Sequence, residues 1–342
     1  MPKTKSDLIL LFGGQSPEHD VSCSSARHVL AAIPRDLFDV TLVGIDRFGT
    51  WHKCLTAEDN DKIDELPEIL TVAGSQTTPH ELFDINGETR LIVFPVLHGP
   101  NGEDGTIQGL LDSFGVPYVG SGVLSSAMCM DKIKSKELLS AHGIPQVSWW
   151  SVNCEASNPV IPSLENSELT FPLFVKPANM GSSIGVSKVT DMSGLKKAID
   201  HASEFDSWVI VEQATEGREI EIAILADGTP EASKPGEVVP GTDFYDYSDK
   251  YEDGATLHVP ADLPIGEVQT AQSIALKVFK LMRCEGLARV DFFFENPGRG
   301  WLVNEINTMP GFTPISMYPK LWEEAGLSYE KLVLRLINSA KS

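Results

Sequence analysis

Residues 176–189 read KPANMGSSIGVSKV, a stretch of small residues that begins with a lysine. The flanking runs LFVKPA and IGVSKVT are both typical of β-strands, so NMGSS is predicted to be a turn between two strands. It lacks P-loop spacing, and in P-loop and Rossmann sites the glycines lead from a strand into a helix. We therefore expect a hairpin flap around phosphate. Gly181 would permit unusual backbone angles and close approach, Ser182 and Ser183 would contact phosphate oxygens, and Lys176 would meet an anion or reach solvent. Taken alone, an ordinary small-residue hairpin remains the alternative.

A second predicted hairpin, residues 288–307 (ARVDFFFENPGRGWLVNEIN), carries the strongest chemical signal in the chain. Two strand-like runs flank the turn NPGRG, and side chains two residues apart on a strand share a face. If this turn forms the loop, Glu295 faces Trp301, and counting back places Asp291 opposite Glu305. Opposed carboxylates repel each other unless a cation lies between them. The pattern therefore predicts a cation site in the hairpin.

The same count places Arg289 opposite Asn307. The oxygen-only set of Asp291, Glu305 and Asn307 suits Mg²⁺, which takes few protein ligands and completes its shell with water and substrate phosphates. An arginine beside such an ion makes sense if phosphate oxygens lie between the two positive charges. For this motif alone, the alternative is an exposed acidic sheet face with a neutralising arginine.

The bulk composition excludes several classes of protein. The formal charge is -21, from 48 acidic and 27 basic residues, which opposes binding to nucleic acid or to an anionic membrane surface. The five cysteines are scattered without a C-x-x-C pair, so neither a disulfide framework nor a zinc site is indicated. No apolar run reaches signal-peptide or membrane-spanning length, and we expect a cytoplasmic protein.

The 342 residues exceed the usual size of one hydrophobic core, and the apolar pattern divides them into three expected units. Residues 1–120 alternate strand-like and helix-like segments, which indicates a doubly wound α/β domain. Residues 121–211 contain the phosphate hairpin. Residues 212–342 contain the metal hairpin and, at 240–255, a long aromatic loop expected to act as a lid.

Two further expectations concern single segments of the chain. The polar segment 46–90 has no readable motif and is expected to be an irregular surface insertion. The segment 120–145, GSGVLSSAMCMDKIKSKELLSAHGIP, is expected to form one helix with a serine cap, closed by Gly143 and Pro145.

Eight motifs together resemble the ATP-grasp superfamily and, within it, the D-alanine–D-alanine ligase family, over nearly the whole chain. They are GGQSPEHDVS, HGPNGEDGTIQGLLDSFGVPYVGSG, MDKIKSK, FVKPANMGSSIGVSKV, VEQATEGREIE, DFYDYSDKY, ARVDFF and NEINTMPGFTPISMYP. The resemblance implies a doubly wound parallel-sheet domain followed by a two-domain ATP-grasp fold. ATP would lie between two α+β units, under the hairpin flap.

The resemblance also implies a set of ATP and metal contacts. Glu212 to Ala214 would contact adenine and Glu219 the ribose. Two Mg²⁺ ions would bridge the phosphates, with Mn²⁺ as an alternative metal and a monovalent cation such as K⁺ as an activator in some relatives. The implied ATP contacts are Lys132, Lys176, Ser182, Ser183, Glu212, Gln213, Ala214, Glu219, Lys250, Asn304 and Glu305, and the implied metal ligands are Asp291, Glu305 and Asn307.

At the substrate end, the resemblance places the first ammonium group on Glu18, with His98 nearby. From the residues alone, Glu18 could equally be a surface charge or cap a helix, and His98 is only a plausible site histidine. Gly311 would help a developing oxyanion, while Ser316, followed by Met317, would receive the second carboxylate. The implied catalytic set is Glu18, Ser182, Tyr251, Arg289 and Lys250, in which Tyr251, Ser182 and Glu18 form a hydrogen-bonded triad.

The reaction implied is the ATP-dependent joining of two D-alanines through a D-alanyl phosphate, releasing ADP and phosphate, for peptidoglycan precursor synthesis by a cytoplasmic homodimer. Another carboxylate–amine ligase or a depsipeptide ligase is the first alternative, although the latter group lacks the tyrosine found here at Tyr251. A dinucleotide-binding oxidoreductase is a second, suggested by the N-terminal pattern and VPYVGSGVLSS, which lacks Rossmann spacing. A non-catalytic nucleotide sensor is the third.

Overall fold

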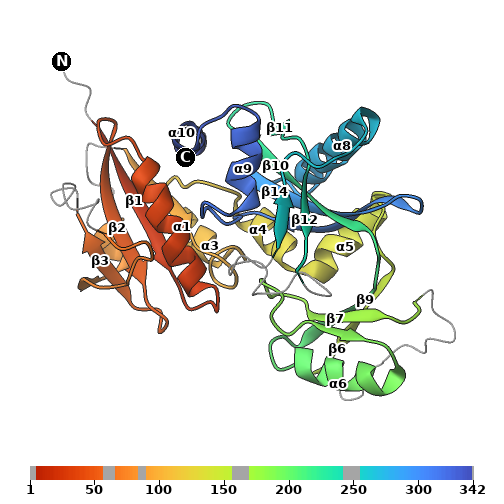
Figure 1. Cartoon of the computed structure of the whole chain (residues 1–342). Helices are drawn as coiled ribbons and strands as arrows, with labels where there is room; N and C mark the ends of the chain where they lie inside the picture. Colours follow the sequence, from red (N-terminus) through yellow and green to blue (C-terminus); the bar gives the residue numbers. More distant parts are fainter. Residues whose placement is uncertain (1–4, 57–65, 84–89, 156–168, 242–254, 341–342) are drawn as a thin grey trace.

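The first sheet of the computed structural model lies in the N-terminal part of the chain, coloured red to orange in Figure 1. The structure describes residues 5–56, 66–83, 90–155, 169–241 and 255–340. Strand β1 (Ser6–Gly13) is parallel to β2 (Phe38–Ile45) on one side and to β5 (Leu91–Val96) on the other. Helix α1 (His19–Ala32) covers one face of the sheet and α3 (Thr106–Phe114) the other, as the doubly wound pattern predicts.

The expectation of an irregular segment at 46–90 was wrong where the structure describes it. Strands β3 (Trp51–Leu55) and β4 (Ser75–Thr77) add antiparallel edges in the order β4-β3-β2-β1-β5, and a short helix α2 (Pro79–Leu82) follows. These strands are short and mostly polar at the sheet edge, so the apolar alternation on which strand prediction depends is weak there. The run VPYVG, expected as a strand, forms only an isolated bridge between Val93 and Tyr118.

The single helix expected at 120–145 is two helices, α4 (Val123–Met130) and α5 (Lys132–Ala141). Asp131 breaks the run: its side chain accepts hydrogen bonds from the backbone N–H groups of Ile133 and Lys134, which is an N-cap for α5. Gly122, not a serine, is the N-cap residue of α4. Both helices pack on the third sheet, where Cys129 and Leu139 are buried.

The second sheet carries the phosphate hairpin. It is antiparallel, in the order β6-β9-β7-β8, and helix α6 (Met192–Ala202) covers it with a buried row of aliphatic residues. Its strands are β6 (Trp149–Asn153), β9 (Trp208–Gln213), β7 (Leu173–Pro177) and β8 (Ser187–Val189). Because β7 and β8 pair antiparallel, with Val175 opposite Ser187, the predicted strand–turn–strand arrangement is confirmed.

The third sheet carries the predicted metal hairpin and has the order β13-β12-β10-β14-β15, with β11 paired to β10. Helix α8 (Ile265–Leu281) covers one face, and α9 (Met317–Glu324) with α10 (Tyr329–Ser339) packs toward the first sheet. The strands are β10 (Arg218–Ala226), β11 (Glu231–Ala232), β12 (Gly236–Val239), β13 (Thr256–His258), β14 (Gly286–Glu295) and β15 (Gly300–Asn307).

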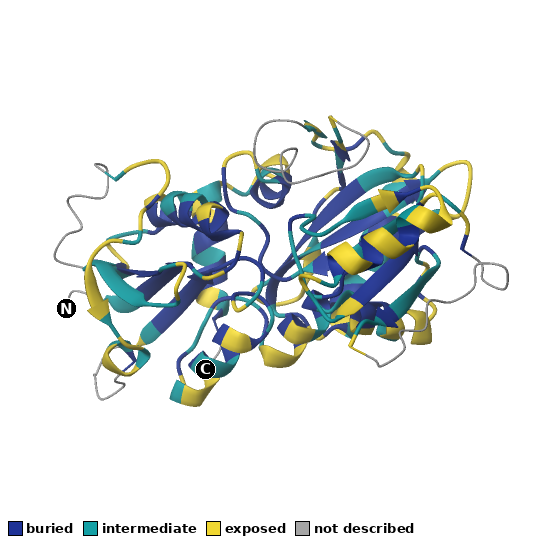
Figure 2. Ribbon diagram, turned by 90° about the horizontal axis from the view of Figure 1, so that it is seen from below, coloured by how far each residue is buried: buried dark blue, intermediate teal, exposed yellow. Residues whose placement is uncertain are grey.

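The three sheets are arranged so that loops from all of them meet. One hydrophobic core runs from the first sheet to α9 and α10, whereas the second sheet has its own core (Figure 1). Figure 2 shows buried strands inside each part and exposed outer helix surfaces. In the described part of the chain, no helix is long and apolar enough to cross a membrane. The division at residues 121 and 212 stays a prediction.

Candidate active site

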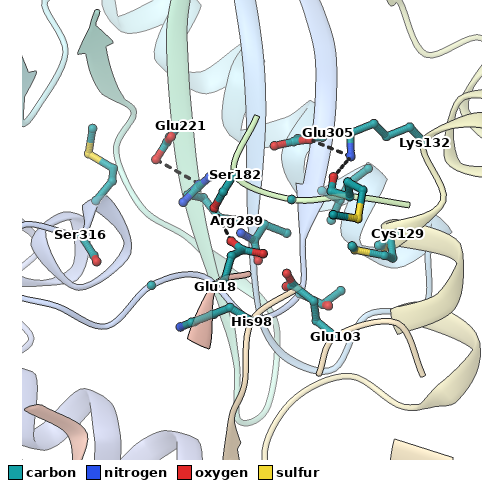
Figure 3. A pocket seen from close by; sticks show the side chains of 18 of the residues that line it. Glu18, His98, Glu103, Cys129, Lys132, Ser182, Glu221, Arg289, Glu305 and Ser316 are labelled. Atoms are coloured by element: carbon teal, nitrogen blue, oxygen red, sulfur yellow. Dashed lines mark hydrogen bonds and ion pairs between the residues drawn. The ribbon is translucent and has the colours of Figure 1, made fainter. Parts of the chain in front are cut away.

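Two adjoining cavities lie where the three sheets meet. The larger, about 360 Å³, lies between the second and third sheets, and the smaller, about 100 Å³, lies between the first and third sheets under the flap (Figure 3). The larger volume is within the range of small-molecule and cofactor sites. The two cavities share Lys132, Met180, Gly181, Ser182, Glu221, Arg289 and Glu305. A group transferred from one cavity to the other would pass these residues.

The larger cavity brings together every described residue that the sequence analysis assigns to ATP. Its walls include the flap on one side and strands β10, β14 and β15 on the other. The assigned residues that line it are Lys132, Lys176, Ser182, Ser183, Glu212, Gln213, Ala214, Glu219, Asn304 and Glu305. Lys250 and Tyr251 lie outside the described residues, as does most of the expected lid.

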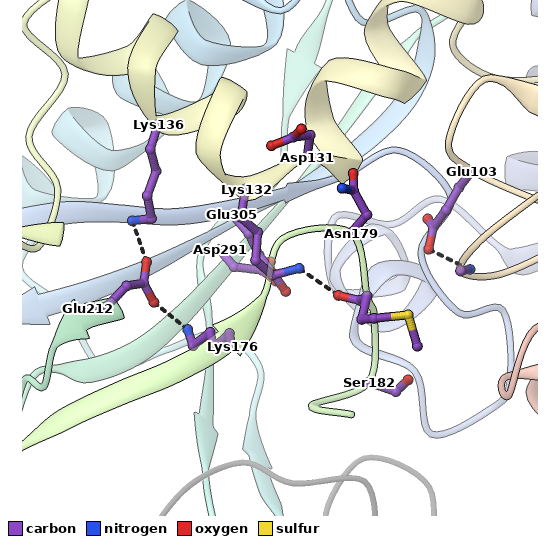
Figure 4. Close-up of polar contacts among 12 residues, drawn as sticks. Glu103, Asp131, Lys132, Lys136, Lys176, Asn179, Ser182, Glu212, Asp291 and Glu305 are labelled. Carbon is purple, nitrogen blue, oxygen red and sulfur yellow. Dashed lines mark hydrogen bonds and ion pairs between the residues drawn. The ribbon is translucent and has the colours of Figure 1, made fainter. Parts of the chain in front are cut away.

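A cluster of three charges lies at this cavity: Glu212 and Lys176 line it, and the buried Lys136 contacts Glu212 (Figure 4). Glu212 Oε2 lies 2.6 Å from Lys176 Nζ, and Oε1 lies 2.8 Å from Lys136 Nζ. Burial alone would raise the pKa of Glu212, but the two lysines outweigh it and hold the pKa at about 2. For Lys176, burial lowers the pKa and Glu212 more than compensates, so the pKa is raised. Lys176 therefore presents a fixed positive charge at the larger cavity.

The flap uses its residues differently from the sequence expectation. The left-handed backbone angles occur at Ser182, Ser183 and Gly185, with φ of 49°, 58° and 70°, and not at Gly181. Non-glycine residues in this region carry strain that the surrounding contacts must hold. Gly181 serves the close approach that was expected of it, because an added Cβ would lie 2.5 Å from Glu18 Oε2.

The flap is joined to the first domain through Glu18. The Ser182 hydroxyl donates a hydrogen bond to Glu18 Oε1, so this part of the implied triad is formed. Glu18 is buried at the start of α1, at the carboxyl end of β1. This contact makes the roof of the larger cavity a wall of the smaller cavity as well (Figure 3).

The metal hairpin has the predicted register near the site but not at its turn. Asp291 pairs with Glu305 and Arg289 with Asn307, as predicted, whereas Glu295 pairs with Gly300 instead of Trp301. The turn is one residue shorter than expected. A β-bulge between positions 291 and 292 takes up the extra residue, Asn304, and so restores the count.

Arg289 is held by carboxylates in this structure. Its Nε lies 2.7 Å from Asp291 Oδ1, and its Nη2 lies 2.7 Å from Asp291 Oδ2. Glu221 Oε2 is 3.0 Å from the same Nε. On the opposite side, Lys132 Nζ donates to the Met180 carbonyl at 2.6 Å and lies 3.9 Å from Glu305 Oε2 (Figure 4). Asp291, Glu221 and Glu305 are therefore each close to a side-chain cation.

His98 and Glu103 line the smaller cavity as neutral groups. His98 Nδ1 lies 2.9 Å from the Met309 carbonyl and must donate, so Nε2, 3.2 Å from the Ser25 hydroxyl, accepts. Burial lowers the pKa of His98, which favours this neutral form. Glu103 accepts a hydrogen bond from Gly99 N at 2.8 Å, and burial, reinforced by the charge of Glu18, raises its pKa to about 8.

The far end of the smaller cavity is formed by the start of α9. Ser316 precedes this helix, and its hydroxyl is 2.8 Å from the Thr313 hydroxyl and 3.1 Å from Thr313 N. An added Cβ at Gly311 would lie 2.7 Å from Ser316 Oγ, which explains the glycine. Met317 is buried beside them. Backbone N–H groups at a helix start attract anions, so this end suits a carboxylate.

Two family models match the chain. The D-ala D-ala ligase N-terminus model covers residues 7–121, and the D-ala D-ala ligase C-terminus model covers residues 138–338. The chain belongs to the D-alanine–D-alanine ligase family. Members of this family are ATP-dependent ligases that use ATP and Mg²⁺, and this chain is an ATP-dependent ligase.

Solved structures of ligases are similar over nearly the full length. The D-alanine-D-alanine ligase from Coxiella burnetii is 34% identical with a TM-score of 0.80, and the match covers 98% of this chain and 93% of that one. The VanG D-Ala:D-Ser ligase from Enterococcus faecalis is 33% identical with a TM-score of 0.81, covering 98% and 99%. These ligases have the ATP-grasp fold, so the predicted fold class is confirmed.

The oxygen donors of this ligase fit the Mg²⁺ that its family uses. Asp291 and Glu305 face each other on adjacent strands, and Asn307 lies on the same face of β15 as Glu305. No group of three His, Cys, Asp or Glu residues in the described regions could hold a metal by itself. Two carboxylates and an amide fit an ion that completes its shell with water and phosphate oxygens. Arg289 would then have to release Asp291.

Three site residues of this ligase were missed by the sequence analysis, and each had a usable signal. Lys136 follows Lys132 by one helical turn and so shares its side of α5. Glu221 follows Glu219 by two residues and so shares its face of β10. Glu103 lies in the loop after His98, at the carboxyl end of β5, where α/β folds place ligand contacts.

Proposed function

We propose that this ligase joins two D-alanine molecules into D-alanyl-D-alanine through a D-alanyl phosphate. The observation that carries the proposal is the Ser182–Glu18 contact, which joins the flap over the nucleotide cavity to the wall of the amino-acid cavity. A phosphoryl group can pass between cavities that share a wall without crossing solvent. Acyl phosphates hydrolyse in water, so this closure would protect the intermediate.

In the first step, a carboxylate oxygen of one D-alanine attacks the γ-phosphorus, and the bond to the β-phosphate oxygen breaks to release ADP. Glu18 orients the ammonium group of this D-alanine. Phosphoryl transfer depends on positioning and charge neutralisation, which Lys132, Lys176 and Arg289 supply at the junction. Mg²⁺ held by Asp291, Glu305 and Asn307 would add further positive charge at the phosphates.

In the second step, the neutral amine of another D-alanine attacks the acyl carbon, and phosphate leaves. The Gly311 N–H would stabilise the developing oxyanion, and Ser316 at the start of α9 would hold the second carboxylate. Met317 and Ile315 give this end of the cavity an apolar lining, which suits a methyl side chain. D-serine is the second candidate, because the VanG relative is a D-Ala:D-Ser ligase.

The test is phosphate release from Mg·ATP with D-alanine, L-alanine, D-serine or D-lactate, followed by product mass. We expect release with D-alanine and a dipeptide product. Hydroxylamine should trap the acyl phosphate as a hydroxamate when D-alanine is present. ATP turnover that ignores D-alanine would refute the substrate assignment, and a mixed D-Ala-D-Ser product would favour the second candidate.

The proposal also includes the lid residues, the cellular setting and the ions that the resemblance implies. Lys250 would neutralise phosphate charge and Tyr251 would complete the triad with Ser182 and Glu18, so Tyr251→Phe should keep the fold and weaken D-alanine turnover. Unchanged turnover and substrate affinity would contradict the triad. The enzyme would act as a cytoplasmic homodimer in peptidoglycan precursor synthesis, which sedimentation analysis and depletion of the protein in cells can test. Mn²⁺ replacement and K⁺ activation can be measured in the same phosphate-release assay.

A further inference from the structure

Three carboxylates form one row across neighbouring strands of the third sheet. Glu221 on β10 pairs with Asp291 on β14, which pairs with Glu305 on β15. Glu221 is buried, lines both cavities and has no role in the reaction outlined above. Carboxylates opposed in this way repel unless positive charge compensates them. Here that charge is supplied by Arg289, two residues before Asp291 on β14.

Arg289 bridges two of these carboxylates. Both oxygens of Asp291 accept from it, at 2.7 Å each, and Glu221 Oε2 lies 3.0 Å from its Nε (Figure 3). The side chains of Arg289, Asp291 and Glu221 are only 14%, 11% and 6% exposed. Water therefore screens their interactions weakly.

The expected metal ligand and the arginine partner are thus the same carboxylate. An Asp291 whose two oxygens both face a guanidinium cannot offer them to a dication while Arg289 stays in place, because the two positive charges would repel each other. The metal-loaded state requires Arg289 to move off Asp291. A released guanidinium needs another partner close to its present position.

We propose that Glu221 is the positioning residue that retains Arg289 at the junction of the two cavities when Asp291 turns to the metal. Glu221 already contacts Nε, so the guanidinium can pivot away from Asp291 and keep this contact. Arg289 then keeps its place beside the phosphoryl path. The inference rests on the proposed function, in which Arg289 neutralises the transferred phosphoryl group.

The test is a Mg²⁺ titration of the purified full chain in the presence of a fluorescent ADP analogue and without any amino acid. Binding of the analogue is monitored by its fluorescence. Glu221→Asp keeps the negative charge but moves the carboxylate away from Arg289 Nε. Arg289 should then stay on Asp291, and we expect the apparent Mg²⁺ dissociation constant to rise about tenfold. Affinity for ADP without metal should change less than twofold. The matched control is Glu237→Asp, which shortens a carboxylate paired with Arg218 in the same sheet, outside both cavities, and should leave the Mg²⁺ constant unchanged.

A second measurement separates positioning from a simple loss of negative charge. Glu221→Gln should raise the Mg²⁺ constant in the native background, but not when Arg289→Ala has removed the guanidinium. A Glu221→Asp variant with native Mg²⁺ affinity, or a Glu221→Gln effect that persists without Arg289, would overturn the proposal. If Glu221→Asp does not fold, the Arg289→Ala comparison decides.

These outcomes stay separate from the identity of the substrate, because no amino acid is present in the titration. Failure of the proposed function would appear instead as phosphate release that does not depend on D-alanine. If Glu221 positions Arg289, kcat for phosphate release should also fall in Glu221→Asp at saturating Mg²⁺, while KM for D-alanine changes little.

Discussion

Glu212→Gln should destabilise the fold strongly at neutral pH, because it leaves the buried Lys136 and the partly buried Lys176 without their shared carboxylate. Lys136 and Lys176 lie 2.8 and 2.6 Å from Glu212, and the Lys136 side chain is 2% exposed. The pKa of Glu212 falls from 4.5 to about 2 on folding, which corresponds to about 3 kcal/mol at pH 7. Removing one partner of a buried pair costs a similar 3–5 kcal/mol or so.

The sign of the pH dependence follows from the lowered pKa. The stabilisation is fully present above pH 4.5 and is lost as the pH falls toward 2. Urea unfolding followed by tryptophan fluorescence should therefore give a gap between native protein and Glu212→Gln of about 3 kcal/mol at pH 7 and about 2 kcal/mol near pH 3.5. Three of the six tryptophans, Trp149, Trp150 and Trp208, lie on β6 and β9, so the signal includes the unfolding of this sheet.

The matched control is Glu295→Gln. Arg299 lowers the pKa of Glu295 to about 2 as well, but Arg299 is 41% exposed at a turn, where water screens the pair. We expect this variant to cost below about 1 kcal/mol. Equal losses for Glu212→Gln and Glu295→Gln, or a gap for Glu212→Gln that does not change with pH, would refute the reasoning.

Three further variants probe the amino-acid cavity. Ser182→Ala removes the hydrogen bond to Glu18 and should lower kcat/KM for D-alanine about tenfold, with unfolding temperature as the control. Gly311→Ala places a methyl 2.7 Å from Ser316 Oγ and should raise KM for D-alanine about tenfold while the circular dichroism spectrum stays native. Glu103→Gln mimics the acid that is protonated below its pKa of about 8. The fold holds this group protonated, so native protein loses stability as the pH rises from 4.5 to 8. The variant should therefore unfold at a higher temperature than native protein at pH 8. Equal unfolding temperatures at pH 8 would contradict the burial argument.

The metal hairpin shows which parts of the strand register can be predicted from the alternation of residues in the sequence and which cannot. Alternation predicted which residues share a face, and this held around Asp291 and Glu305. The turn was missed by one residue because side-chain packing fixes it. Phe294 and Trp301 stack at 4.2 Å with rings 25° apart, a cross-strand pair that requires them to be opposite each other. The bulge at Asn304 reconciles this pairing with the carboxylate pairing.

Charge pairs between residues far apart in the sequence could not be predicted from local sequence patterns. The spacing in KIKSK places Lys136 on the same side of α5 as Lys132, but it does not indicate that the partner of Lys136 is Glu212. That pairing depends on how α5 packs against the second sheet. A mid-helix lysine is usually solvated, so the local prior was against burial. The same holds for Glu103, whose raised pKa comes from burial and from Glu18, a residue on a different loop.

The shared wall of the two cavities links nucleotide and amino-acid binding. Ser182 lines both, donates a hydrogen bond to Glu18 and adopts a left-handed backbone conformation that this contact helps to hold. Gly181 approaches Glu18 so closely that the closed flap leaves no room for a larger residue. We therefore expect the flap to lift before the first amino acid reaches Glu18 and to close over ATP afterwards. Under the proposed function, a single hairpin would then control both the phosphate donor and the carboxylate that accepts it, which is the coupling that a water-sensitive acyl phosphate requires.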